Sequence, residues 1–221
     1  MTHVSPAWAM EEIEIDHWLV NRKESWPNWH LPDSLKYPGF KDDLVYPDWF
    51  QGDWKVTTLE INESTQPTFS HLARFLLDPS NRVVADREYN VASLGKSVFG
   101  DELIVVKNDP KTPNRQFSKF KSNRYLETTI IGRREDISNK NIFYSDELTL
   151  EVFYLMGQAN IKQVETLSRF SECKSSEISD LGLPVRSICG EQFVAIYAEP
   201  GNTLFLAPDK VRSYKLILTP I

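Results

Sequence analysis

The stretch Tyr46-Pro-Asp-Trp-Phe-Gln-Gly-Asp-Trp-Lys-Val-Thr-Thr-Leu-Glu60 marks the point where this sequence changes character. Before it, the chain is irregular and rich in tryptophan, proline and acidic residues. From Gly52 onward the residues alternate, with Trp54, Val56 and Thr58 on one side and lysine, threonine and leucine on the other. An alternation with a period of two predicts a β-strand that has one reasonably apolar face.

The chain after this stretch reads as a succession of short strands separated by turns. The expected strands cover residues 71–77, 82–89, 103–106, 115–120, 124–133, 143–154, 161–170, 192–199 and 212–219. The segment 90–98 is compatible either with a turn around Leu94-Gly95-Lys96 or with a short helical turn. Sequential antiparallel strands of this kind predict an all-β fold, an up-and-down barrel of about eight to ten strands. A barrel of about eight strands is just wide enough to hold one small ligand.

Residues 1–45 are expected to form an N-terminal arm, and residues 46–221 the barrel domain. Residues 11–24 have the spacing of a short amphipathic helix, and repeated prolines then predict an extended path. All six tryptophans lie within the first 54 residues, and residues 1–48 hold nine acidic and four basic side chains. Because tryptophan rings are costly to leave in water, we expect the arm to dock on the barrel or on another protein.

Composition excludes several functional classes. The formal net charge of -6 argues against nucleic-acid binding. No run of roughly 18 apolar residues is present, so no transmembrane segment is expected. The first ten residues lack the charged and apolar regions of a secretory signal.

The two cysteines, Cys173 and Cys189, are too few for a disulfide framework, and the chain has no Cys-x-x-Cys motif. They stand near facing ends of a predicted hairpin, which leaves a single disulfide open. The default expectation is two ordinary thiols.

No catalytic constellation is recognisable, so catalytic residues are expected to be none and an enzyme is the less favoured reading. The four histidines are scattered, and only His71 lies in the predicted barrel, without partners at metal-ligand spacing. Ser70 and His71 are neighbours on one strand and face opposite sides, which excludes a nucleophile–base pair. Basic residues over 115–134 form a ribbon that is read either as a solvated strand face or as a site for an anionic group.

The tripeptide Gly52-Asp53-Trp54 resembles the Gly-x-Trp signature of the calycins, the lipocalin-like barrels. In that group the tryptophan lies across the closed end of the barrel, often covered by an arginine of the last strand. The resemblance therefore implies that Gly52, Trp54 and Arg212 form the structural base of a barrel.

A wider set of motifs resembles a family of uncharacterised cyanobacterial and plastid proteins over roughly residues 44–221. The motifs are Tyr46-Pro-Asp-Trp-Phe-x-Gly-x-Trp54, Val83-Val-Ala-Asp-Arg87, Asp109-Pro-x-x-Pro-Asn-Arg-Gln116, Val164-Glu-Thr166 and Tyr214-x-Leu-x-Leu-Thr-Pro220. This resemblance implies an oxygenic phototroph and a place in the plastid or the cyanobacterial cytoplasm, with the thylakoid periphery as one option. It supplies no activity and no cofactor.

The favoured expectation is a soluble barrel that binds a small hydrophobic or amphipathic ligand such as a tetrapyrrole, a carotenoid or a lipid-like molecule. An arginine or tyrosine near the mouth would pair with an acidic group of the ligand, and the candidate contacts are Arg124, Tyr144, Tyr154 and Tyr197. The alternative is a non-catalytic assembly or scaffold protein whose arm docks on a thylakoid or photosystem-related protein. A third reading, by analogy of fold alone, is a bilin lyase-like chromophore chaperone.

Overall fold

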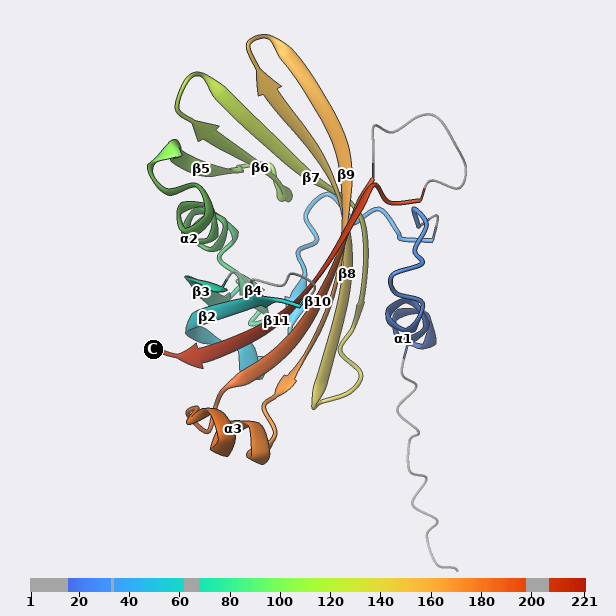
Figure 1. The fold of residues 1–221 in the computed structure, drawn as a ribbon, viewed down its shortest axis with the longest axis vertical. Coiled ribbons are helices and arrows are strands. Elements are labelled where there is room, and N and C mark those ends of the chain that lie inside the picture. The colour runs from blue at the N-terminus through green and yellow to red at the C-terminus, as the bar shows by residue number, and fades with distance from the viewer. Residues whose placement is uncertain (1–15, 33, 62–67, 198–206) are drawn as a thin grey trace, which may run out of the picture.

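The computed structural model describes residues 16–32, 34–61, 68–197 and 207–221, which form one curled antiparallel sheet with three α-helices around it (Figure 1). The eleven strands follow the order β1-β4-β3-β2-β11-β10-β9-β8-β7-β6-β5. Their bounds are β1 (Val45–Tyr46), β2 (Gly52–Glu60), β3 (Thr68–Leu77), β4 (Val83–Ala85), β5 (Leu103–Asp109), β6 (Thr112–Phe120), β7 (Arg124–Asp136), β8 (Ile142–Leu155), β9 (Gln158–Glu172), β10 (Ile188–Tyr197) and β11 (Lys210–Pro220). The helices are α1 (His17–Glu24), α2 (Arg87–Phe99) and α3 (Ser175–Leu181), with 3-10 turns η1 (Asp48–Phe50) and η2 (Gly100–Glu102).

The all-β prediction is confirmed, and the sheet takes the form of a half-barrel. The predicted strand over 82–89 is three residues long, because Asp86 begins a helix by accepting a hydrogen bond from the backbone N–H of Tyr89 at 3.2 Å. Helix α2 ends at Gly100, whose φ of 55° lies in the left-handed region. The helix packs against both β3 and β5, so it lies across the gap that the sheet leaves between its two sides (Figure 1).

The concave face of the sheet holds the main core. The predicted alternation of β2 is present, with Trp54, Val56 and Thr58 buried on this face. Trp54 is 1% exposed, and its indole N–H donates to the backbone oxygen of Phe50 at 2.6 Å. Aromatic rings from β3, β8 and β9 complete this end of the core: Phe75, Phe143 and Phe170.

The convex face is covered by the N-terminal arm. Helix α1 runs over β7 to β10, and the buried side chains of Leu19 and Trp29 pack against Leu167, Ala195 and Tyr197. Of the predicted helix over 11–24, residues 17–24 are helical and residues 11–15 lie outside the described residues. The arm thus docks on the barrel with the tryptophans that the structure describes, which is one of the two outcomes expected for them.

After α1, the arm continues along the sheet and forms hydrogen bonds with β7 and β6. The backbone N–H of Arg133 on β7 donates to the carbonyl of Lys36 at 2.8 Å. The side-chain amide of Asn114 on β6 donates to the carbonyls of Gly39 and Asp42. Through these hydrogen bonds, backbone groups of the arm find partners in the sheet. The arm is therefore a layer of the fold in this region.

The structure joins Cys173 to Cys189 by a disulfide, which corrects the default expectation of two thiols. Cys173 follows β9 and Cys189 lies on β10, and the antiparallel register places their Cα atoms 4.8 Å apart. The bridge closes the segment that carries α3. Within the described residues, no helix is long and apolar enough to cross a membrane.

Candidate functional site

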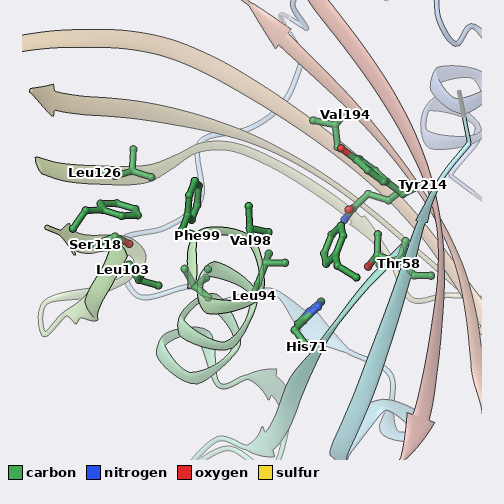
Figure 2. A pocket seen from close by; sticks show the side chains of 16 residues that line it. Thr58, His71, Leu94, Val98, Phe99, Leu103, Ser118, Leu126, Val194 and Tyr214 are labelled. Atoms are coloured by element: carbon green, nitrogen blue, oxygen red, sulfur yellow. The ribbon is translucent and has the colours of Figure 1, made fainter. Parts of the chain in front are cut away.

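A cavity of about 440 Å³ lies between α2 and the concave face of the half-barrel (Figure 2). Strands β2, β3, β10 and β11 form one wall, and α2 with β5, β6 and β7 forms the other. This volume falls within the roughly 300–1,000 Å³ that is usual for small-molecule sites. The cavity lies where α2, packed on β3 and β5, crosses the gap between the two sides of the sheet.

The wall that contains α2 is almost entirely apolar. Helix α2 contributes side chains one helical turn apart, including Val91, Leu94 and Val98, and it ends on Phe99. Leu103, Phe120 and Leu126 continue this surface across β5, β6 and β7. Leu94, Val98 and Phe99 remain partly exposed to solvent, and Phe99 is 52% exposed. When a hydrophobic ligand covers apolar side chains at the rim of a cavity, their removal from water is favourable and contributes to binding.

The opposite wall carries a patch of polar groups on four neighbouring strands. Thr58 on β2, His71 on β3, Gln192 on β10 and Tyr214 on β11 all line the cavity, and Figure 2 shows His71, Thr58 and Tyr214 on this side. Burial lowers the pKa of His71, so its imidazole is uncharged at neutral pH. The Nδ1 atom of His71 is buried and has no hydrogen-bond partner.

The lining of this cavity contains no lysine, arginine, aspartate or glutamate among the described residues. Two ion pairs with largely buried side chains lie outside this lining. Arg87 at the start of α2 binds Asp43 of the arm at 2.6 Å, and Arg133 on β7 binds Glu147 on β8 at 2.7 Å. The first pair joins α2 to the arm, the second joins β7 to β8, and none of the four residues lines the cavity.

A second buried polar cluster lies on the convex face, beneath α1. Arg22 donates two hydrogen bonds to the carboxylate of Glu165, at 2.7 and 2.6 Å, and the hydroxyl of Tyr197 donates to the same carboxylate at 2.5 Å. Asp146 and Glu165 are both 0% exposed. Burial raises the pKa of Asp146 well above its usual range, and the negative charge of Glu165 raises it further. This cluster joins α1 to β8, β9 and β10.

The four predicted ligand contacts do not come together, and none of them lines the cavity. Arg124 forms an ion pair with Glu102, beside the turn between β6 and β7, and Tyr154 is exposed near the tip of the β8–β9 hairpin. Tyr144 and Tyr197 pack on the convex face with the arm. The strand register decides this, because Tyr197 pairs with Gln163 and shares the face of Glu165.

The three residues predicted to form the base of the barrel, Gly52, Trp54 and Arg212, do not all lie together. Gly52 begins β2 with a φ of 130°, and Trp54 lies buried at that end. Arg212 does not cover Trp54, since the antiparallel register pairs Trp54 with Pro220 at the far end of β11. Instead the guanidinium of Arg212 lies 3.3 Å from the carboxylate of Glu60 at the other end of β2. The structure thus places Trp54 and Arg212 near opposite ends of β2.

The basic ribbon over 115–134 is largely neutralised within the chain. Arg115 pairs with Glu127 at 2.6 Å, Arg134 pairs with Asp16, and the pairs of Arg124 and Arg133 are described above. Four arginines of the ribbon thus have carboxylate partners. This favours the interpretation of the ribbon as a strand face whose charges are paired within the chain, rather than as a site for an anion. Across the described part of the chain, no three histidine, cysteine, aspartate or glutamate side chains are close enough to hold a metal ion.

Sequence reasoning missed the polar patch of the cavity, although part of its signal was present. His71 alternates with Ala73 and Phe75, and Tyr214 alternates with Leu216 and Leu218, as expected for residues that share the inner face. The alternation says which residues share a face. It does not say that α2 would stand opposite them and leave space between.

These features define the class of the protein: an antiparallel half-barrel of one sheet, with a helix across its opening and a mostly apolar cavity beneath the helix. The chain belongs to the family described as "Domain of unknown function (DUF6816)", whose model matches residues 59–218. That range contains α2 and all the cavity-lining residues except Thr58. No curated protein and no solved structure matches the chain.

Proposed function

We propose that this protein binds a small hydrophobic or amphipathic molecule in the cavity under α2. The observation that carries the proposal is the cavity of about 440 Å³, apolar on one wall and with a few convergent polar groups on the other. Such a combination is usual for small-molecule sites, where apolar burial supplies affinity and polar groups set orientation. Burial of apolar surface is worth roughly 25 cal/mol per Å², so contact with the apolar wall would supply a favourable contribution to binding.

The test compares two neighbouring substitutions on β7. Leu126 lines the cavity, whereas Tyr125, the next residue, points to the opposite face and is exposed. We expect Leu126→Trp to occupy part of the cavity and to weaken binding of the uncharged dye N-phenyl-1-naphthylamine by roughly tenfold or more, which corresponds to about 1.4 kcal/mol. Tyr125→Trp should leave the affinity as in the wild type. Dye fluorescence, titrated with each full-length protein, is the measurement, and equal affinities for both variants would contradict the proposal.

The identity of the ligand belongs to the same proposal. The resemblance to cyanobacterial and plastid proteins favours a tetrapyrrole, a carotenoid or a lipid-like molecule, and a location in a plastid or a cyanobacterial cell, with the thylakoid periphery included. An absorption spectrum of the protein purified from its native host separates these candidates. Bands in the visible range would identify a pigment, and a colourless protein whose organic extract contains one enriched lipid would identify a lipid.

The scaffold reading gains no support from the described part of the arm. Trp18, Trp26 and Trp29 pack on the convex face of the same chain, and Trp29 is buried. Rings that are already covered in this way do not serve as anchors for a partner without a rearrangement of the arm. No observation specifically favours the chromophore-chaperone function. We therefore favour the ligand-binding proposal over the scaffold and chaperone alternatives.

A further inference from the structure

The two walls of the cavity differ in polarity, and the difference points to the chemistry of the occupant. The α2 wall offers hydrocarbon side chains with the hydroxyl of Ser118 as its one polar group among the described residues. The sheet wall offers Thr58, His71, Gln192 and Tyr214 at neighbouring positions. A molecule that satisfies both walls has an apolar body and one polar group at its side or end.

We infer that the ligand is uncharged, and that it carries one hydrogen-bonding oxygen, as in a long-chain or ring alcohol, ketone or ester, which faces His71 and Thr58. The inference rests on the proposed function and names the class of molecule. It differs from the expectation of an acidic group paired with arginine or tyrosine at a mouth.

The described lining offers no counter-charge to an ionised ligand. A carboxylate or ammonium group that leaves water for an apolar site needs an opposite charge and several hydrogen bonds. On the face of β11 that carries Tyr214, the nearest cation is Arg212, two residues away. It is not in the lining, and it is bound to Glu60. A charged head group in this cavity would therefore lose its hydration and gain no ion pair.

The polar patch does offer hydrogen bonds to an uncharged oxygen. A neutral imidazole donates with one ring nitrogen and accepts with the other. The Nδ1 atom of His71 is buried without a partner, and a buried polar atom in that state destabilises the empty protein. A hydroxyl group of a ligand can either donate to or accept from the imidazole of His71, which lines the cavity, and the side chain of Thr58 on the adjacent strand offers a second hydroxyl. An alcohol matches this patch in both tautomers of the histidine, and a ketone or ester matches it in the tautomer whose ring N–H points to the ligand.

The experiment is a displacement of bound N-phenyl-1-naphthylamine from the full-length protein by compounds of matched length. At about pH 8, dodecanoate is deprotonated and dodecylamine is protonated, and both are used below their micellar concentrations with 1-dodecanol and tridecane. We expect 1-dodecanol to displace the dye at a concentration roughly tenfold lower than either ion requires. Displacement by dodecanoate at the same concentration as 1-dodecanol, or a lower one, would overturn the inference.

Two variants test the polar patch. His71→Phe removes both ring nitrogens, and Thr58→Val removes one hydroxyl with almost no change of shape. We expect each to bring the half-displacing concentration of 1-dodecanol closer to that of tridecane, with both concentrations corrected for the dye affinity measured for the same variant. Ser70→Ala, an exposed neighbour of His71 on the opposite face of β3, is the control and should keep the wild-type preference. An unchanged preference for the alcohol in both patch variants would contradict the inference, and Thr58→Val answers the question if His71→Phe does not fold.

The outcomes separate this inference from the proposed function. If the dye binds and Leu126→Trp weakens its binding, but the ions compete as well as the alcohol does, the cavity is a binding site and the assigned ligand class is wrong. If the wild-type protein binds no dye, or Leu126→Trp binds it unchanged, the proposed function itself is overturned.

Discussion

At the scale of single residues, the most unusual group is the carboxyl of Asp146 on β8. It is fully buried, both its oxygens lack a hydrogen-bond partner, and it lies close to the buried carboxylate of Glu165. Burial raises the pKa of Asp146, Glu165 raises it further, and the guanidinium of Arg22 lowers it. The charged and titratable groups that interact with Asp146 are these two, Tyr197 on the same face, and Glu147 on the opposite face of β8. The folded protein therefore favours the protonated form of Asp146.

This arrangement predicts how Asp146→Asn changes stability with pH. Since the pKa is raised on folding, the favourable contribution of the protonated acid is complete below the unfolded pKa of about 4 and is lost as the pH rises through the folded pKa. Asparagine does not ionise. The free energy of unfolding of the variant should therefore increase relative to the wild type from about pH 4 upward, by roughly 1.4 kcal/mol for each pH unit until the folded pKa is reached.

Urea unfolding of both proteins at about pH 4.5, 6 and 7.5 measures this difference. The exposed Asp101 provides the control, because Asp101→Asn removes a carboxylate far from the network. A difference between wild type and Asp146→Asn that stays constant over this range would show that Asp146 is ionised throughout.

At the scale of elements, helix α1 shows how the arm is held on the convex face. It is eight residues long, too short to be stable alone in water, so its contacts with the sheet must maintain it. The apolar contacts come from Leu19 and the tryptophans, and the polar anchor is the pair of Arg22 with Glu165. The adjacent Lys23 also forms an ion pair, with Glu191 at 2.7 Å, but both side chains there are partly exposed.

The two neighbouring ion pairs of α1 should differ strongly in their contribution to stability. Arg22→Met leaves Glu165 buried without its partner, and we expect a loss of about 3–5 kcal/mol. Lys23→Met removes a partly exposed pair and should cost less than about 1 kcal/mol. Chemical unfolding gives both values, and near-UV circular dichroism reports whether Trp18 and Trp29 keep their packing. Equal losses for the two variants would show that the buried network does not hold the helix.

At the scale of the whole molecule, the half-barrel has two features that stabilise an incompletely closed sheet. Helix α2 lies across the gap and packs on β3 and β5. The Cys173–Cys189 disulfide ties the end of β9 to the start of β10 and closes a segment with a sequence separation of 16 residues. Constraining the unfolded chain over such a loop is expected to stabilise the fold by about 3 kcal/mol.

Reduction of the disulfide should therefore lower the stability of the entire sheet. We expect the wild type in dithiothreitol, and the double variant Cys173→Ser/Cys189→Ser in any buffer, to lose about 2–4 kcal/mol of unfolding free energy. Dithiothreitol should leave the double variant unchanged, which controls for other effects of the reductant. A wild-type protein that unfolds at the same urea concentration with and without reductant would contradict the contribution assigned to the bridge.

The local patterns of the sequence predicted most strands correctly and could not predict the space between the elements. The alternation from Gly52 to Glu60 is confirmed because a period of two is set by the backbone of one strand alone. The segment 90–98 stayed ambiguous, since its conformation as part of α2 depends on packing against β3 and β5 as well as on the cap at Asp86. The cavity, which arises from that packing, had no local signal.

The amino-acid sequence is sufficient to establish the all-β class, the inner-facing residues of β2 and the family to which the chain belongs. Strand pairing in three dimensions settles which face carries Tyr144 and Tyr197, how Cys173 meets Cys189, where Arg212 lies relative to Trp54, and which side chains line the cavity. Each of these depends on the register between strands that are distant in the chain. Moving the register by one residue transfers every side chain of a strand to the other face, so the site exists only once the strands have paired and α2 has closed the gap.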